Sequence, residues 1–337
     1  MRKDLPEPSP RNGLTNPRLV EGEFSIQIDS IHLLAPDSLR KWNEANSAGT
    51  RLQPTLLLWC SDLADYTGQR IAAKQNSGEQ PTELTTEDEN GNRILFWDLS
   101  GQVNDSSKIT IRRKFTYTTY NYAPLLDEAK LEANTAPDDL VNRYTKSEPL
   151  LEQTPELVRL ANKIVINQPT MLSKSRAIFN WVRDTMHYKY PPDARGILEV
   201  VKSYQGDCGQ YSVLFVGLCR SVGIPARQQS GFVVSDTSFD YHVWSEIFLA
   251  GIGWVPMDTT IPDGFGKLPN NRLIASVGMN IPLKHVPAWA TYENQEAQCG
   301  RTDFMQFSTM VMSGFTARIT TDRSVTKNEL LQQGPLK

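Results

Sequence analysis

The sequence is poor in the residues that build metal sites and disulfide scaffolds. Its 337 residues include four cysteines and four histidines, and neither C-x-x-C nor H-E-x-x-H occurs. Widely spaced cysteines argue against a disulfide framework or a zinc ribbon, and scattered histidines argue against a metal centre. We therefore expect no bound metal and no cofactor.

Two further absences narrow the class of protein. Neither G-x-x-x-x-G-K-[ST] nor G-x-G-x-x-G is present, so no phosphate-binding loop is indicated. The 35 basic and 38 acidic residues nearly balance, which gives no reason to expect a nucleic acid as partner. The longest apolar runs, such as LLLWC at 56–60, are far shorter than the ~20 residues of a membrane span.

Composition divides the chain into five segments. In order, we predict a disordered arm (1–19), a β-rich domain (20–122), a polar linker (123–150), a mixed helix and strand domain (151–321) and a loose polar tail (322–337). The arm is rich in proline, asparagine and charge and lacks the apolar stretch of a signal peptide. This predicts a cytoplasmic protein, with a secreted chain whose signal has been removed as the alternative.

The β-rich segment shows the period-two pattern of half-buried strands. EFSIQID (23–29) alternates apolar and polar residues, and so does KITIRRKFTYTTY (108–120) apart from Arg113. These strands predict an antiparallel sheet or sandwich. The segment 151–321 mixes helical periodicity with further strands, so the expected fold class is α+β, an N-terminal antiparallel β domain followed by a mixed domain.

GDCGQYSVLFVGLCRSVGIPAR (206–227) predicts a helix with a cysteine at its start. Asp207 can cap this helix, which puts Cys208 at about the first position. The free N–H groups and the dipole of a helix N-terminus favour the thiolate, which is the reactive form of cysteine. The alternative is a buried, inert cysteine, and this is how we interpret Cys219 and Cys60.

Two strands downstream supply a histidine and an aspartate. Alternation in YHVWSEIF (241–248) and in GWVPMD (253–258) puts His242 and Asp258 on one surface if the strands pair as a hairpin. A helix with Cys208 at its tip can pack against that surface. The result is a thiol, a base and a carboxylate that orients the base. Without the hairpin, His242 is a structural histidine.

Glu246 shares the predicted strand face with His242. A buried carboxylate without a partner is costly. We therefore expect a cation such as Arg227 to pair with Glu246.

The blocks GDCGQYSVLFVGLCRSVGIPAR, HVWSEIFL and GWVPMDTT, in this order, resemble the cysteine helix, histidine strand and aspartate strand of the transglutaminase-like superfamily. That fold is a circularly rearranged relative of papain, and the likeness covers about residues 155–262. Carried over residue by residue, the resemblance implies Cys208 as the nucleophile, His242 as the base and Asp258 as its orienting partner. It also implies that the domain 151–321 is catalytic and that the β domain is an accessory one.

The implied activity is cysteine-dependent acyl transfer on peptide or protein amides through a thioester. Water as the acceptor makes the enzyme a peptidase or amidase, and an amine as the acceptor makes it a transglutaminase. The expected partner is a peptide or protein substrate. Two alternatives stay open: a catalytically silent binding or scaffold protein on the same fold, because fold does not prove activity, and a metal protein that uses Cys208 and His242.

Overall fold

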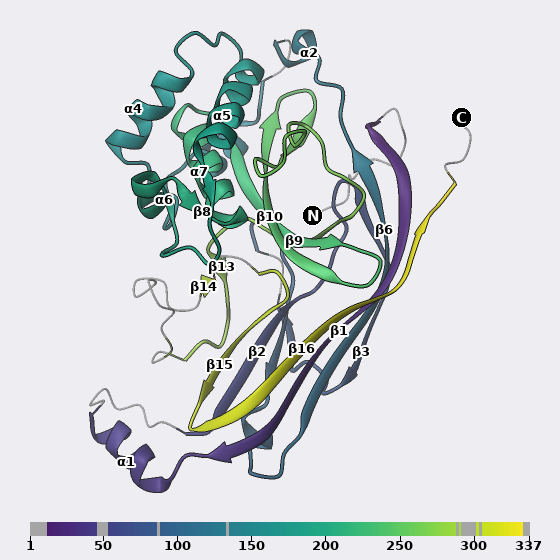
Figure 1. Cartoon of the computed structure of the whole chain (residues 1–337), viewed down its shortest axis with the longest axis vertical. Coiled ribbons are helices and arrows are strands. Elements are labelled where there is room, and N and C mark those ends of the chain that lie inside the picture. Colours follow the sequence, from purple (N-terminus) through teal and green to yellow (C-terminus); the bar gives the residue numbers. More distant parts are fainter. Residues whose placement is uncertain are drawn as a thin grey trace.

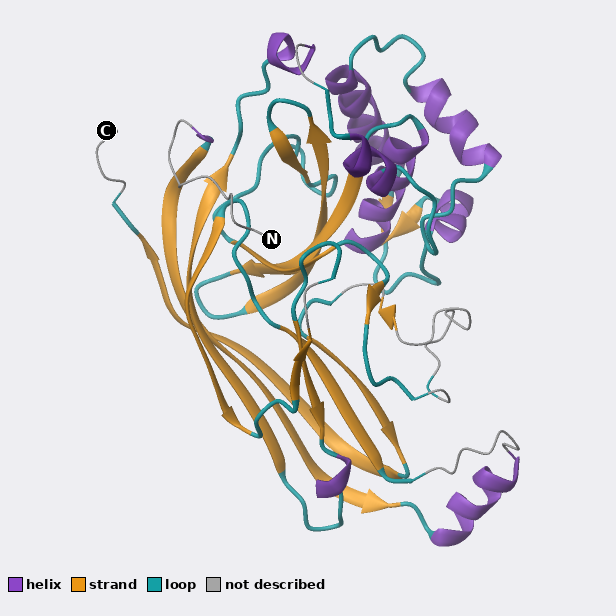
Figure 2. Cartoon of the chain, turned by 180° about the vertical axis from the view of Figure 1, so that it is seen from behind, coloured by secondary structure: helices purple, strands orange, loops and turns teal. Residues whose placement is uncertain are grey.

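The structure is an α+β arrangement in which a long β-sandwich adjoins a mixed region of helices and strands (Figure 1). The computed structural model describes residues 12–45, 53–85, 88–132, 135–287, 290, 301–302 and 305–332. Most helices gather at one end of the molecule and the long strands extend away from them, as Figure 2 shows. No helix within the described ranges is long and apolar enough to cross a membrane.

One sheet of the sandwich is antiparallel, with the strand order β16-β1-β6-β3. Its strands are β1 (Leu14–Leu33), β3 (Gln69–Gly78), β6 (Ile109–Tyr122) and β16 (Phe315–Leu330). The alternating patterns at 23–29 and 108–120 predict β1 and β6, and the structure confirms both strands. The apolar positions of the first pattern are buried, namely Phe24, Ile26 and Ile28.

The second sheet of the sandwich has the order β15-β2-β5-β4. Its strands are β2 (Thr55–Ser61), β4 (Glu83–Thr85), β5 (Ile94–Asp98) and β15 (Ser308–Ser313), and two short helical segments adjoin the sandwich, α1 (Pro36–Ala45) and η2 (Ser100–Gln102). Ile26 and Ile111 of the first sheet share one hydrophobic core with Leu58 and Trp97 of the second. The alternating apolar residues therefore close a sandwich.

Two predictions about the chain ends are wrong. β1 begins at Leu14, inside the predicted disordered arm 1–19, and β16 continues through 322–330, which the sequence predicts to be a loose tail. Both segments are polar, but each obtains backbone hydrogen bonds from a neighbouring strand, a source of stability that local composition does not reveal. Residues 1–11 and 333–337 lie outside the described part of the chain.

The C-terminal strands also change how the chain is divided. β15 pairs with β2 and β16 pairs with β1, so both strands lie in the sandwich. Residues 308–321, which the sequence assigns to the mixed domain 151–321, therefore lie with the N-terminal strands instead. The sandwich is built from both ends of the chain, and the mixed region is inserted between them (Figure 1).

The mixed region contains an antiparallel sheet with the order β11-β10-β9-β12. These strands are β9 (Ala226–Val234), β10 (Phe239–Leu249), β11 (Gly253–Met257) and β12 (Arg272–Val277). Two small pairs are β7 (His187–Tyr188) with β8 (Gln205–Gly206), and β13 (Ile281–Pro282) with β14 (Arg301–Thr302). The sheet follows the helices in the chain, as expected from the strand patterns after residue 225.

Helix α7 (Cys208–Ser221) is the central helix of this region. It packs against β9 and β10, and other helices contact it. The remaining helices are α2 (Glu128–Glu132), α3 (Asp138–Tyr144), α4 (Pro155–Ile164), α5 (Met171–Thr185) and α6 (Ile197–Ser203). Thr154 caps α4 by accepting a hydrogen bond from the Leu157 backbone N–H at 3.2 Å, in the sequence setting typical of a helix start.

An aromatic cluster joins the sandwich to the mixed region. Phe24 of β1 lies 4.6 Å, between ring centroids, from Phe115 of β6. It also lies 4.8 Å from Phe232 of β9 and 5.0 Å from Phe239 of β10. Phe24 is only 3% exposed, so the core of the sandwich continues into the sheet of the mixed region without a solvent layer at this point.

We expect Phe24→Ala to lower the free energy of unfolding by about 3–5 kcal/mol, because it removes a large buried ring and leaves a cavity. Urea unfolding followed by circular dichroism measures this loss. The matched control is Leu125→Ala, whose side chain is 77% exposed and whose loss should cost less than about 0.5 kcal/mol. Equal effects of the two substitutions would contradict the role given to the cluster.

Candidate active site

Cys208 is the first residue of α7, as the sequence predicts. Asp207 caps the helix, and its carboxylate accepts a hydrogen bond from the Gln210 backbone N–H at 3.2 Å. The same carboxylate accepts a hydrogen bond from Arg195 Nη1 at 2.7 Å. The negative charge next to the cysteine is therefore balanced by a guanidinium and by the helix N-terminus.

The described cysteines differ in their exposure to solvent. Cys208 is partly exposed, whereas Cys60 and Cys219 are fully buried in hydrophobic cores. Burial raises the pKa of Cys60 to about 12 and raises the pKa of Cys219 well above its usual range. Cys60 and Cys219 are therefore core residues, as predicted. Cys299 lies outside the described residues.

His242 and Asp258 are in direct contact. β10 and β11 form the expected hairpin, with Ser245 opposite Met257, and Asp258 directly follows β11. His242 Nε2 lies 2.8 Å from Asp258 Oδ2, and the two side chains are 13% and 1% exposed. Cys208 also makes a side-chain hydrogen bond with His242. The structure thus brings together the three residues that the sequence singles out.

The surroundings set the charges of this pair. Burial by itself lowers the pKa of His242, but hydrogen bonds with Asp258 and Cys208 outweigh burial and raise the pKa to about 9. Burial would raise the pKa of Asp258, but its hydrogen bond with His242 and further interactions lower it to about 2. At neutral pH the site therefore holds an imidazolium and a carboxylate.

One detail of the expected geometry is wrong. α7 does not pack on the strand face that carries His242. Its Ser212 hydroxyl donates to the Trp244 carbonyl oxygen at 3.0 Å and lies 2.6 Å from Ser245 Oγ, so the helix covers the opposite face of β10. Cys208 reaches His242 because it lies at the end of the helix.

Asp258 has two further partners that sequence reasoning missed. Asp258 Oδ1 accepts hydrogen bonds from the Thr260 hydroxyl at 2.6 Å and from the Thr260 backbone N–H at 3.2 Å. Arg272 Nη2 of β12 lies 3.3 Å from Asp258 Oδ2. Thr260 lies two residues away, where a turn contact is a common possibility. No local pattern links Arg272 to Asp258, because sheet pairing brings them together.

Tyr188 lies near the cysteine, on the short strand that follows the helix α5. Its side chain is 63% exposed. Burial is the largest cause of a raised pKa for Tyr188, and the charges of Cys208 and Asp207 add to it. Its hydroxyl therefore stays protonated at neutral pH and can donate a hydrogen bond.

Glu246 is paired as the sequence predicts. Arg227 Nε donates to Glu246 Oε1 at 2.5 Å, and Gln229 Nε2 donates to Glu246 Oε2 at 2.9 Å. Gln229 Oε1 in turn accepts a hydrogen bond from Trp244 Nε1 at 2.6 Å. This network stabilises the strand on which His242 lies and satisfies a carboxylate that is 7% exposed.

Part of the chain matches a family of known proteins. Residues 158–259 match the transglutaminase-like superfamily model. This segment includes the cysteine, the histidine and the aspartate described above. The chain therefore contains a transglutaminase-like domain.

Similar proteins occur in bacteria. An uncharacterized protein of Haemophilus influenzae is 25% identical over 210 residues, which are 52% of this chain and 55% of that protein. The uncharacterized protein YebA of Bacillus subtilis is 27% identical over 210 residues, which are 54% of this chain and 27% of YebA. The matches thus span about half of the first relative and about a quarter of the second.

A solved structure shares the overall fold. The crystal structure of a candidate cysteine protease from Cytophaga hutchinsonii aligns with a TM-score of 0.58 at 14% identity. The alignment covers 93% of this chain and 94% of that chain. The sandwich and the mixed region therefore occur together in another protein.

The raised pKa of His242 predicts how stability depends on pH. His242 has a pKa of about 9 in the folded chain, against 6.5 for a histidine exposed to solvent. Its stabilising contribution is therefore full below about pH 6.5 and lost as the pH rises through about 9. At about 1.4 kcal/mol per pKa unit, we expect the stability difference between wild type and His242→Gln to fall by about 3 kcal/mol from pH 6 to pH 10.

Urea unfolding at each pH measures that difference. His32→Gln is the control, because His32 is exposed on β1 in the sandwich. A stability difference between wild type and His242→Gln that does not change with pH would contradict the buried ion pair.

Arg272 is expected to keep Asp258 ionised. The contribution of Asp258 to stability is present above its usual pKa of 3.8 and is lost as the pH falls through about 2. Arg272→Met removes a positive charge beside Asp258, so this loss should begin at a higher pH, whereas Arg272→Lys should behave more like the wild type. Urea unfolding at pH 5 and at pH 3 tests this. Parallel pH dependence in all three proteins would contradict it.

Proposed function

We propose that this chain is a cysteine-dependent enzyme that transfers acyl groups from peptide or protein amides through a thioester. The observation that carries the proposal is the hydrogen-bonded series Cys208, His242 and Asp258, with the cysteine at a helix N-terminus. This arrangement supplies a nucleophile, a proton carrier and a group that orients it. The roles of these residues are part of the proposal.

In the first step, the Cys208 sulfur, whose proton has passed to His242, attacks the amide carbonyl carbon. His242, charged at neutral pH, donates its proton to the departing amine nitrogen, and the C–N bond breaks. The acyl group is left on sulfur as a thioester. Asp258 holds the imidazole ring by its Nε2, which leaves the other ring nitrogen for the sulfur and for the leaving group.

The oxyanion that forms in this step needs hydrogen-bond donors. The Cys208 backbone N–H is in the first turn of α7, where N–H groups have no partner within the helix. We propose this N–H as one donor. The protonated hydroxyl of Tyr188 is our candidate for the second donor. Tyr204 packs edge-to-face against Trp181, so we do not propose it as a donor.

In the second step, neutral His242 removes a proton from water or from an amine, which attacks the thioester and frees Cys208. We propose water as the main acceptor. Tyr188, beside the cysteine, is 63% exposed, so this edge of the site is open to solvent. Efficient transfer to an amine requires that water be excluded from the acyl-enzyme.

The scaffold alternative differs from the proposal in thiol reactivity. Burying a charged imidazole costs free energy unless the charge is paired. A protein that only binds gains nothing from an imidazolium beside a partly exposed thiol, whereas a cysteine enzyme uses it. The metal alternative has no support from the side chains: within the described ranges, no group of three or more His, Cys, Asp or Glu residues is arranged so that it could hold a metal ion.

We expect iodoacetamide to label Cys208 far faster than Cys60 and Cys219, since those two thiols are buried. His242→Ala should slow the labelling of Cys208 at neutral pH, because the positive charge that favours the thiolate is lost. Mass spectrometry of peptides from the labelled protein measures each site. If Cys208 labels as slowly as Cys219, the scaffold alternative is correct.

Activity itself is tested with a glutamine-containing peptide, with and without a primary amine. We expect release of ammonia or peptide cleavage without the amine, and a loss of at least about a thousandfold in Cys208→Ala. Cys60→Ala is the matched control for loss of a cysteine. Product found only as the amine adduct would favour a transglutaminase, and equal rates in wild type and Cys208→Ala would refute the proposed nucleophile.

A further inference from the structure

A cavity of about 330 Å³ lies at the end of β2 in the sandwich, away from the candidate active site. Leu63 and Ile71 give it an apolar side, together with Ala64, Ala72 and Ala73. Lys74 and Arg93 give it a cationic side. Pockets that combine an apolar wall with a few convergent polar groups are the usual form of small-molecule sites.

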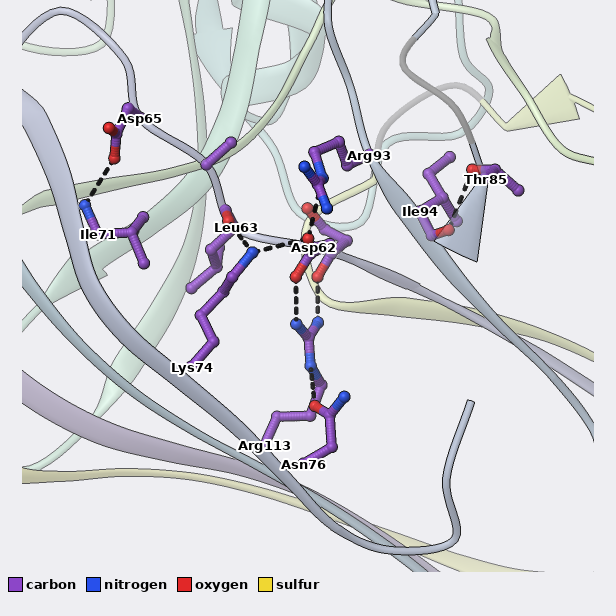
Figure 3. A network of polar contacts seen from close by, with 12 residues as sticks. Asp62, Leu63, Asp65, Ile71, Lys74, Asn76, Thr85, Arg93, Ile94 and Arg113 are labelled. Atoms are coloured by element: carbon purple, nitrogen blue, oxygen red, sulfur yellow. Dashed lines mark hydrogen bonds and ion pairs between the residues drawn. The ribbon is translucent and has the colours of Figure 1, made fainter. Parts of the chain in front are cut away.

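The cationic side is built around one buried carboxylate (Figure 3). Asp62 is 6% exposed, and its Oδ2 lies 2.7 Å from Lys74 Nζ and 3.1 Å from Arg93 Nε. Its Oδ1 lies 3.0 Å from Arg113 Nη2. Three cations therefore surround one carboxylate. Asp65, on the other side of the cavity, accepts a hydrogen bond from the Ile71 backbone N–H at 2.7 Å, and one net positive charge remains.

The three cations differ in how many of their donors are used. Arg113 donates to Ser61, Asp62 and Asn76, so it is a structural group. Among the described residues, Arg93 donates a hydrogen bond only through its Nε. Neither of its terminal nitrogens donates to another described residue. Asp62 receives only the Nε of Arg93. Arg93 thus has planar paired donors at the cavity, the geometry that matches a carboxylate.

The strand beside the cavity is bulged. Ile71 is paired with Tyr117 and Ala73 with Thr116, so Ala72 is an extra residue in β3 without a partner in the ladder. Ala72 lines the cavity. Bulges of this kind are over-represented beside functional sites, where they redirect side chains.

The cavity also lies close to the sheet of the mixed region. The Ser61 hydroxyl donates to the Ala275 carbonyl oxygen, and Gln69 Nε2 donates to the Ile274 carbonyl oxygen at 3.0 Å. Both acceptors belong to β12, the strand whose first residue, Arg272, contacts Asp258. The cavity therefore lies where the sandwich meets the transglutaminase-like domain, and domain junctions are preferred positions for ligand sites.

We propose that this cavity binds the carboxylate of a small aliphatic organic acid. The carboxylate would pair with the terminal nitrogens of Arg93 and with Lys74, and the aliphatic part would contact Leu63 and Ile71. Free amino-acid derivatives and the C-terminus of a peptide share this chemistry. The proposal does not depend on the catalytic role of Cys208.

Isothermal titration of the full chain with N-acetyl-L-valine tests the site, with L-valinamide as the probe that lacks a carboxylate. We expect saturable binding of N-acetyl-L-valine, with a dissociation constant of ~1 mM as is usual for so small a ligand, and none of L-valinamide. A tetrapeptide with a C-terminal valine distinguishes a peptide source: tighter binding than N-acetyl-L-valine assigns the site to a chain terminus, and equal binding assigns it to the free acid.

Arg93→Gln should weaken the binding of N-acetyl-L-valine at least about tenfold, because a charge-assisted hydrogen bond is lost. Circular dichroism shows whether Arg93→Gln is folded. If it is not, Lys74→Gln serves as the second variant. Arg112→Gln is the matched control: Arg112 is 52% exposed on β6 and faces Glu23, and binding should be unchanged.

Three results would overturn the proposal. They are equal binding of N-acetyl-L-valine and L-valinamide, no saturable binding of N-acetyl-L-valine, and binding of inorganic phosphate without binding of the organic acid. Equal affinity in wild type and in a folded Arg93→Gln would likewise place the ligand elsewhere.

Discussion

Strand β10 is paired on both edges, and the candidate active site depends on this constraint. On one side β11 brings Asp258 within 2.8 Å of His242. On the other side, Gly231 of β9 lies opposite His242. A Cβ at Gly231 would lie only 1.9 Å from the Leu273 carbonyl oxygen of β12, so the close approach of β12 requires glycine here. β9 pairs with β10 at His242 itself and β11 pairs with β10 from Ser245 onward, so the backbone that carries the imidazole ring is held in place.

Buried carboxylates next to arginine recur through the molecule. Asp258 contacts Arg272, Glu246 contacts Arg227, and Asp62 contacts Arg113. Each carboxylate is at most 7% exposed, and a charge buried without a partner would be costly. The three pairs lie at different places: the first contacts His242, the second lies on β10, and the third lies at the end of the sandwich beside the cavity lined by Lys74 and Arg93.

Much of the fold was predictable where the pattern was local. The alternation at 23–29 and 108–120 located β1 and β6, and the cap at Asp207 located the start of α7. The polar C-terminal segment was not predictable in this way. β16 is stable because it pairs along β1, more than 280 residues away in the chain, and such a partner leaves no mark on local composition. Arg113, which interrupts the alternation of β6, is explained only by Asp62.

The sequence by itself determined which residues of the site are available and what kinds of elements carry them. Asp207 and Cys208 begin a helix because of capping chemistry, and His242 lies on a strand because of alternation. Only the tertiary structure decided that α7 covers the face of β10 opposite His242, and that Arg272 meets Asp258. Helix and strand periodicity define the faces of one element, whereas the choice of facing partner depends on packing between elements distant in the chain.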